Sequence, residues 1–261
     1  MPLIALMTDF GTRDYYVAAT KGVILSVNPK ATLVDISHDI DSQDLYHGAF
    51  VLRNVLPYFP AETIFVAVVD PGVGTSRRIL AGRYNDRIVL APDNGLLTLV
   101  HRDAQLQALH VVENRRYFAS AISATFHGRD IFAPVAAHLS RGISLGDLGA
   151  PADRIEVLNI PRPQFNPDGS IDGMVVLVDR FGNMITNISE IDLTAARTPR
   201  PHLEVHLGDR LIGPVRHTYG DVAPGEPLAL IGSSRMLEIA VNSGHAAQVL
   251  SAGRGTPIHL G

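Results

Sequence analysis

The stretch TIFVAVVDPGVGTSRR, residues 63–78, decides the fold of the first half of this chain. From Ile64 to Val69 it is an unbroken apolar run, which is typical of a strand covered on both faces of a sheet. Asp70 ends the run, and the Pro-Gly pair that follows turns the chain at once. Open α/β sheets hold their ligands at the carboxyl ends of such strands. We therefore expect an α/β domain with a polar site just after this strand.

Strand-like runs and helix-like segments alternate on both sides of this stretch. The runs that we expect to form further strands lie at residues 3–10, 32–37, 78–84, 87–92 and 108–113. Apolar residues recur at the spacing of an amphipathic helix at residues 17–28, 44–59 and 130–142. This alternation predicts a three-layer α/β domain with a mostly parallel sheet over residues 1–164.

The composition of the sequence changes between about residues 151 and 173, where IPRPQFNPDGSIDG (160–173) is rich in proline, glycine and aspartate. Such composition is typical of a linker or a turn-rich connection. Short alternating runs bounded by Gly, Pro and Asp follow at residues 174–183, 202–213, 227–234 and 235–242. They predict a smaller all-β domain over residues 165–261, either a barrel or a sandwich.

Composition narrows the classes of function. The 261 residues carry a formal charge of −4, which offers no basic surface, so we expect no nucleic-acid partner. The absence of cysteine excludes disulfides and thiolate chemistry. No apolar run reaches the roughly 20 residues of a membrane span, and the N-terminus lacks the basic region of a signal peptide. We therefore expect a cytoplasmic protein without a membrane partner.

Four polar segments follow apolar runs: MTDFGTRD (7–14), VVDPGVGTSRR (68–78), TFHGRD (125–130) and VDRFGNMITNI (178–188). In the second segment the loop is long enough to return the guanidinium of Arg77, or of its neighbour Arg78, to Asp70. The alternative is a structural ion pair on a surface loop. His127 follows an apolar stretch and precedes an expected helix, which suits a pocket imidazole, although a single histidine is more often a structural hydrogen-bonding residue.

The first and fourth segments suit a nucleoside. Asp9 ends the first expected strand, where a carboxylate can accept both hydroxyl protons of a ribose. Asp14, in the same segment, either contacts the ligand or serves as the N-cap of the helix that follows. Asn183 offers a donor and an acceptor side by side, which suits an adenine edge. The alternative for its segment is a glycine-containing hairpin bulge.

Together the four segments resemble the S-adenosyl-L-methionine (SAM) hydrolase family, also called SAM hydroxide adenosyltransferases, which is related to the bacterial fluorinase and chlorinase. The resemblance runs from about Ala5 to about Asn242. It implies that Asp70, Arg77 and His127 form a catalytic triad. The resemblance also implies a set of substrate-binding residues. For the nucleoside these are Asp9 at the ribose, Asn183 at adenine and Phe181 for stacking. For the methionine part they are Asp14 and Tyr16 nearby, Asp179 at its ammonium, and Ser234 and Arg235 at its carboxylate.

The resemblance implies hydrolysis of SAM to adenosine and L-methionine, by attack of water at C5′ of the ribose. SAM is then the substrate, and no cofactor is expected. No segment has HExxH or EF-hand spacing, so we expect no metal. An arginine beside Asp70 would make that carboxylate a weaker base, so we expect His127 to accept the water proton. Family members are described as trimers, which implies a homotrimer with the ligand between the α/β domain of one subunit and the β domain of its neighbour.

Other functions fit part of the sequence. A halogenase is disfavoured by Asp70, because the fluorinase pattern has a tyrosine there and a carboxylate would repel a halide. Gly128 stands where the fluorinase has a halide-binding serine, but the chlorinase also has glycine there. A non-catalytic adenosine or SAM sensor would explain the binding positions but not the triad. A structural α/β protein whose loop acids merely cap helices would make the four-segment match a coincidence.

Overall fold

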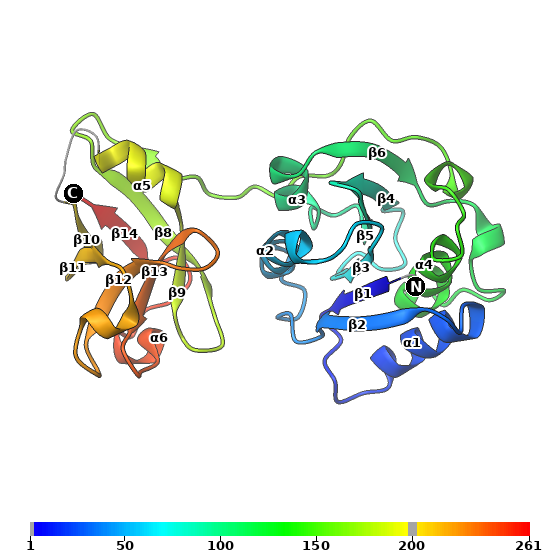
Figure 1. Cartoon of the computed structure of the whole chain (residues 1–261), viewed down its shortest axis with the longest axis horizontal. Helices are drawn as coiled ribbons and strands as arrows, with labels where there is room; N and C mark the ends of the chain where they lie inside the picture. Colours follow the sequence, from blue (N-terminus) through cyan, green and yellow to red (C-terminus); the bar gives the residue numbers. More distant parts are fainter. Residues whose placement is uncertain (1–2, 198–202) are drawn as a thin grey trace. The chain divides into compact units, whose positions relative to one another are not determined.

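The computed structural model describes residues 3–197 and 203–261, and the chain divides into two compact units, Met1–Asn159 and Ile160–Gly261 (Figure 1). Each unit has a hydrophobic core of its own. The expected fold class, an α/β domain followed by a smaller all-β domain, is confirmed. Within the described residues, no helix has both the length and the apolar character needed to pass through a membrane.

The first unit is built on a sheet that has six strands within residues 3–159, in the order β2-β1-β3-β5-β4-β6. These strands are β1 (Leu3–Thr8), β2 (Thr32–Ser37), β3 (Ile64–Val68), β4 (Ile79–Tyr84), β5 (Arg87–Pro92) and β6 (Leu106–Val111). β1 pairs in parallel with β2 and β3, and β3 pairs in parallel with β5. β4 runs antiparallel to β5 and β6. The sheet is therefore mostly parallel, as expected.

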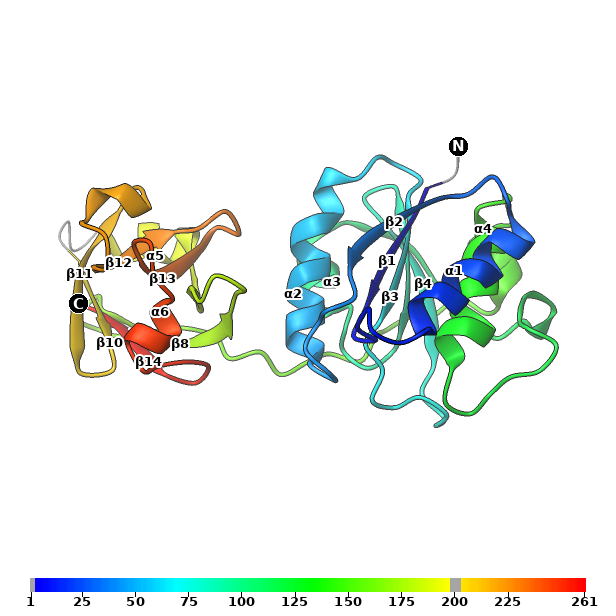
Figure 2. The ribbon, with the colours of Figure 1, turned by 90° about the horizontal axis from the view of Figure 1, so that it is seen from below.

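Helices cover both faces of this sheet and complete the three layers. The helices are α1 (Tyr16–Val27), α2 (Leu45–Val55), α3 (Thr98–Asp103) and α4 (Ala133–Leu139). Figure 2 shows α2 and α3 on one face and α1 and α4 on the other. Shorter turns are the 3₁₀ segments Leu56–Tyr58, Arg115–Tyr117 and Leu145–Leu148, and the π-helical turn Gly128–Phe132. Every residue of β3 is buried between these layers, which explains its continuous apolar sequence.

The second unit is a β-barrel, in the strand order β14-β10-β11-β12-β13-β9-β8-β7. Its strands are β7 (Gln164–Phe165), β8 (Ile171–Val178), β9 (Met184–Ser189), β10 (Glu204–Leu207), β11 (Arg210–Arg216), β12 (Pro227–Ile231), β13 (Met236–Val241) and β14 (Pro257–Leu260). Its helical segments are α5 (Glu190–Arg197), the 3₁₀ turn Tyr219–Asp221 and α6 (Ala246–Val249). Antiparallel pairing of β14 with β8, from Ile171 opposite Leu260 to Met174 opposite Pro257, closes the ring.

The structure adds elements that the sequence patterns did not predict. These are α3, α5, α6, β7, β9 and β14. The helix expected from Asp130 instead begins with the π-helical turn at Gly128, and α4 follows it. The strand run expected at residues 202–213 forms β10 and β11, and its first residue, 202, lies outside the described residues.

Candidate active site

The loop after β3 folds back on itself and returns Arg77 to Asp70. Arg77 Nε donates to both carboxylate oxygens at 2.9 Å, and Nη2 donates to Oδ2 as well. Within the loop, the hydroxyl of Thr75 donates to the Gly72 carbonyl at 2.7 Å, and the Arg77 N–H donates to that hydroxyl at 3.3 Å. The Asp70 and Arg77 side chains are only 4% and 9% exposed. This is a buried, multiply bonded ion pair, which holds its geometry rigidly.

Arg78, the alternative partner of Asp70, points elsewhere. Its Nε donates to Asp93 Oδ2 at 2.9 Å, and its Nη2 donates to the carbonyl of Arg154 at 3.0 Å. The structure therefore brings Arg77, and not Arg78, to Asp70.

Gly74 brings this loop against the segment that carries the histidine. Its φ is +79°, and a Cβ at this position would lie 2.3 Å from the carbonyl oxygen of Ala124. Only glycine fits both the backbone conformation and the contact. The close approach places the loop beside the segment that ends in His127.

His127 joins the ion pair through its ring. Arg77 Nη2 lies 2.9 Å from His127 Nδ1. A guanidinium only donates, so Nδ1 accepts, and the neutral ring then carries its proton on Nε2. Burial lowers the pKa of His127, and the charge of Arg77 lowers it further, against smaller opposing effects of Asp70 and Asp130. At neutral pH the imidazole is therefore uncharged and presents an N–H.

Asp130 anchors the π-helical turn that begins after His127. Its side chain is buried and accepts hydrogen bonds from the Ser123 N–H at 2.8 Å and from Arg129 Nε at 2.6 Å. The hydrogen bond from Arg129 is the main reason why the pKa of Asp130 is lowered. The Arg129 guanidinium also lies 4.9 Å from the centre of the Phe126 ring. These contacts fix the backbone on both sides of His127, as is common for π-turns at functional sites.

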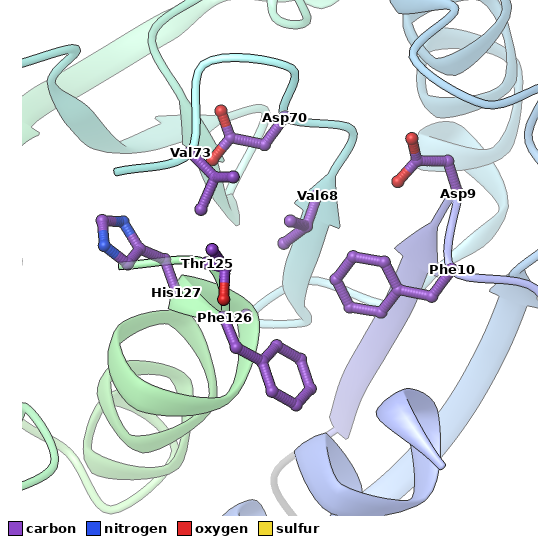
Figure 3. Close-up of a pocket in the computed structure, with 9 residues that line it drawn as sticks. Asp9, Phe10, Val68, Asp70, Val73, Thr125, Phe126 and His127 are labelled. Carbon is purple, nitrogen blue, oxygen red and sulfur yellow. The ribbon is translucent and has the colours of Figure 1, made fainter. Parts of the chain in front are cut away.

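A pocket opens at this point on the first unit. Figure 3 shows the residues that line it, which are Asp9, Phe10, Val68, Asp70, Val73, Thr125, Phe126, His127 and Gly128. Its empty volume, including the open mouth, is about 300 Å³. A Cβ at Gly128 would lie 3.0 Å from the Phe10 ring, so the aromatic side chain packs directly on this glycine. The pocket thus sets carboxylate and imidazole groups against apolar walls.

Apart from Gly128, which was considered only as a halide position, sequence reasoning missed five residues that line this pocket. These are Phe10, Val68, Val73, Thr125 and Phe126. Each lies within three positions of a predicted site residue, which is the one sequence signal that could have indicated them. Apolar residues in loops carry no pattern of their own, so only the fold shows which of them face a ligand.

Of the residues predicted near the first segment, Asp9 lines the same pocket and Tyr16 contacts another residue of its lining. Asp9 Oδ2 accepts the N–H of Gln43 at 2.9 Å, and Asp9 lines the pocket. The Tyr16 ring meets that of Phe126 edge to face, with centroids 5.1 Å apart. Asp14 is exposed, and the N-cap of α1 is Tyr15 without a side-chain hydrogen bond. The alternative that Asp14 caps this helix is therefore wrong.

The predicted residues of the fourth segment form the turn between β8 and β9. Asp179 Oδ1 accepts the N–H groups of Phe181 at 2.9 Å and Asn183 at 2.8 Å, and Oδ2 accepts from Asn183 Nδ2 at 3.1 Å. Gly182 has a φ of +88°. The glycine-containing turn considered for this segment is therefore present. It holds Asp179 and Asn183 together and leaves the Phe181 side chain 76% exposed.

Ser234 and Arg235 lie in the turn between β12 and β13. Arg235 has a φ of +61°, which is uncommon outside glycine. Its Nε donates to Glu190 Oε2 at 2.9 Å, yet its side chain is 79% exposed. An ion pair this exposed binds weakly, so the guanidinium can exchange it for another carboxylate.

Two sets of predicted residues therefore emerge, one in each unit. Arg77 contacts both Asp70 and His127, and Asp9 lines the same pocket. Asp179, Phe181 and Asn183 share one turn of the barrel. Across residues 3–197 and 203–261, no group of three or more His, Asp or Glu side chains has an arrangement that could hold a metal ion.

Comparison with known proteins gives a consistent result over nearly the whole chain. The model of the SAM hydroxide adenosyltransferase N-terminal domain matches residues 4–149, and that of the C-terminal domain matches residues 173–259. A (R)-S-adenosyl-L-methionine hydrolase of Salinispora tropica is 39% identical over 99% of this chain and 97% of its own. A fluorinase of an Actinoplanes species is 30% identical over 93% and 91%. An uncharacterized conserved protein of Thermotoga maritima has a similar crystal structure, with a TM-score of 0.90 and 38% identity over 98% and 99% of the two chains.

Proposed function

Because this chain belongs to the SAM hydroxide adenosyltransferase family, we propose that it is an enzyme that hydrolyses S-adenosyl-L-methionine to adenosine and L-methionine. The observation that carries the proposal is the contact of Arg77 with both Asp70 and His127 beside a pocket. A protein that only bound the ligand would have no use for such a set, because binding requires no activated water.

The reaction needs few catalytic groups. Water attacks C5′ of the ribose, the C5′–S bond breaks, and its electron pair stays on sulfur, so methionine leaves as a neutral thioether. The positive charge on sulfur disappears as the bond breaks. Apolar walls such as Phe10, Val68 and Phe126 therefore favour the transition state over the cationic ground state. The leaving group needs no proton, and the site has only to hold the water and take one proton from it.

The hydrogen-bond directions support one division of these two tasks between His127 and Asp70. Arg77 occupies His127 Nδ1, so the Nε2–H of His127 is left to donate to the oxygen of the attacking water. Asp70 faces the pocket and keeps lone pairs beyond those that Arg77 uses, so Asp70 accepts the water proton. This proposal differs from the sequence-based expectation that His127 is the base, and in it Asp70 takes the proton although Arg77 weakens it as a base.

The proposal extends to the substrate contacts. Asp9 binds the ribose hydroxyls, Asp14 and Tyr16 approach the methionine part, Asp179 binds its ammonium, Ser234 and Arg235 its carboxylate, Phe181 stacks on the ligand and Asn183 pairs with adenine. The exposed ring of Phe181 and the exposed guanidinium of Arg235 support this part, because both are available to a ligand. The enzyme uses no cofactor and no metal, and works in the cytoplasm as a homotrimer. The ligand lies between the α/β unit of one subunit and the β unit of its neighbour.

Incubation with SAM tests the reaction. We expect adenosine and methionine, separated by chromatography, with both products lost in Asp70→Asn, which keeps the shape of the side chain but not its charge. The assay compares the R and S forms of SAM, because the Salinispora relative is named for the R form. Tight binding of SAM without any product would instead identify a sensor.

The fluorinase relative makes halogenation the second candidate. Asp70 is the observation against it, because its buried carboxylate lines the pocket and would repel an incoming halide. The same incubation with added fluoride or chloride should give no 5′-halogenated nucleoside. Formation of one would reverse the argument from Asp70.

A further inference from the structure

A line of hydrogen bonds runs from helix α1 to the loop that carries Asp9. Lys21 Nζ lies 2.6 Å from Asp35 Oδ2, and Asp35 Oδ1 lies 3.0 Å from His38 Nε2. His38 Nδ1 lies 2.8 Å from the hydroxyl oxygen of Thr8, and this oxygen accepts the N–H of Phe10 at 3.3 Å. The line thus ends on the backbone of a pocket residue.

The donors and acceptors along this line can all be paired when the His38 ring carries one proton, on Nε2. Lys21 only donates and the Asp35 carboxylate only accepts, so His38 Nε2 carries a proton. Nδ1 of the neutral ring then accepts the hydroxyl proton of Thr8, which leaves the Thr8 oxygen free to accept the backbone N–H of Phe10. Thr8 and His38 are 3% and 5% exposed, so water cannot readily replace either partner.

The segment that begins at His38 holds the Asp9 loop at two further points. The carbonyl oxygen of His38 accepts the N–H of Gly11 at 2.8 Å. The N–H of Gln43 donates to the Asp9 carboxylate itself at 2.9 Å. Asp9 therefore lies between two contacts of His38, one to Thr8 before it and one to Gly11 after it.

We propose that His38 is a positioning residue, which holds residues 8–11 so that the Asp9 carboxylate faces the ribose of the substrate. The inference rests on the proposed function, because it assumes that Asp9 binds a ribose. His38 touches neither the pocket nor the reacting atoms; it acts through Thr8 and the loop backbone.

Two substitutions test the hydrogen bonds of the two ring nitrogens of His38 one at a time. In His38→Asn the side-chain oxygen takes the place of Nδ1, so the hydrogen bond from Thr8 survives and the one to Asp35 is lost. In His38→Gln the longer side chain reaches Asp35 in the place of Nε2, so the hydrogen bond from Thr8 is lost. His38→Gln gives up a buried hydrogen bond and His38→Asn a partly buried one, so both should lose thermal stability, His38→Gln the more.

The expected result is a difference in substrate binding between the two variants. His38→Gln should raise the KM for SAM and the Kd for adenosine roughly tenfold, the effect of about one lost hydrogen bond. Its kcat should change by no more than about twofold, because the ribose contact exists in both the ground state and the transition state. His38→Asn should stay within about threefold of wild type in KM. Thr8→Val should behave like His38→Gln, and Thr8→Ser should restore binding.

If the KM for SAM rises in both His38→Asn and His38→Gln in proportion to their losses of thermal stability, His38 is merely structural and the inference is overturned. Adenosine binding separates this failure from that of the proposed function. If the wild type binds adenosine but does not hydrolyse SAM, the proposed reaction fails, and the adenosine Kd values of the variants still decide the role of His38. If the wild type does not bind adenosine, both proposals fall.

Discussion

Arg77 contacts both other members of the triad with one planar guanidinium. It donates to two oxygens of Asp70 and to Nδ1 of His127. A lysine ammonium is a point charge and cannot reproduce this fork. We therefore expect Arg77→Lys to lower kcat roughly 100-fold while the protein stays folded, the size of effect typical of misplacing an acid–base group.

Arg78→Lys is the matched control for that measurement, since Arg78 is adjacent and its partner Asp93 does not line the pocket. Steady-state kinetics on both variants should leave Arg78→Lys close to wild type. An equal loss in the two variants would mean that the loop, and not the guanidinium contact, determines the rate.

The titration of His127 gives a prediction for stability. Burial and the charge of Arg77 lower its pKa below the ordinary value of 6.5, so the folded state binds this proton less readily than the unfolded state. The stability that follows from this difference is fully present above pH 6.5 and is lost as the pH falls through the lower pKa of the folded state. Between pH 7 and 5, the Tm of the wild type should fall more than that of His127→Gln. Parallel Tm curves would contradict the shift.

The residues of the site were predictable to different degrees. Asp70 follows from its place at the end of a buried strand, which sequence shows directly. The contact of Arg77 with His127 depends on Gly74 and Ala124, which bring two distant loops together, and a single sequence carries no signal of that packing. The role proposed for His127 differs from the sequence-based expectation because the hydrogen bond from Arg77 to Nδ1 leaves the ring proton on Nε2, and residue type alone does not indicate the tautomer.

The turn between β8 and β9 is the element on which the barrel part of the proposed site depends. Gly182 has a φ of +88°, and a Cβ there would lie 2.2 Å from the His245 ring, whose side chain caps α6. Gly182→Ala should therefore destabilise the second unit by about 2 kcal/mol or more, from backbone strain and from the clash together.

Gly208 provides the control for that substitution. Its φ is +56°, but a Cβ there would meet no atom within 4 Å, so Gly208→Ala adds only the backbone strain, about 1 kcal/mol. Urea unfolding of both variants measures the two costs. Similar losses would show that the His245 contact relaxes at little cost.

Some elements were predicted with their exact ends. RIVLAP, with its continuous apolar run, forms β5, and TLVDIS forms β2 although Asp35 interrupts its apolar residues. β9 did not stand out, because Thr186 and Asn187 interrupt its apolar residues although both are buried. Asn187 is satisfied by the N–H of Met174 at 2.8 Å and the carbonyl of Pro161 at 3.1 Å, partners that only the folded barrel supplies. β14 and α3 are too short to carry a periodic signal.

At the scale of the whole molecule, two hydrophobic cores stabilise two units. The barrel core includes Ile258 and Leu260, which are 1% and 0% exposed and lie on the strand that closes the ring. Replacing either with alanine should cost the second unit about 2–5 kcal/mol.

Hydrogen exchange would locate that loss. In Leu260→Ala, amides of β8 to β14 should exchange faster than in the wild type, whereas those of β1 to β6 should keep their protection. Faster exchange throughout residues 3–159 would show that the two units unfold as one.

The pairing of β8 with β14 also has a consequence for synthesis on the ribosome. The backbone groups of β8 that finally face β14 leave the exit tunnel long before their partners have been translated. Until then they form an unpaired strand edge, which other nascent chains can join. A translational pause between the codons of β13 and β14 would lengthen this interval, and with it the time for which the edge is exposed.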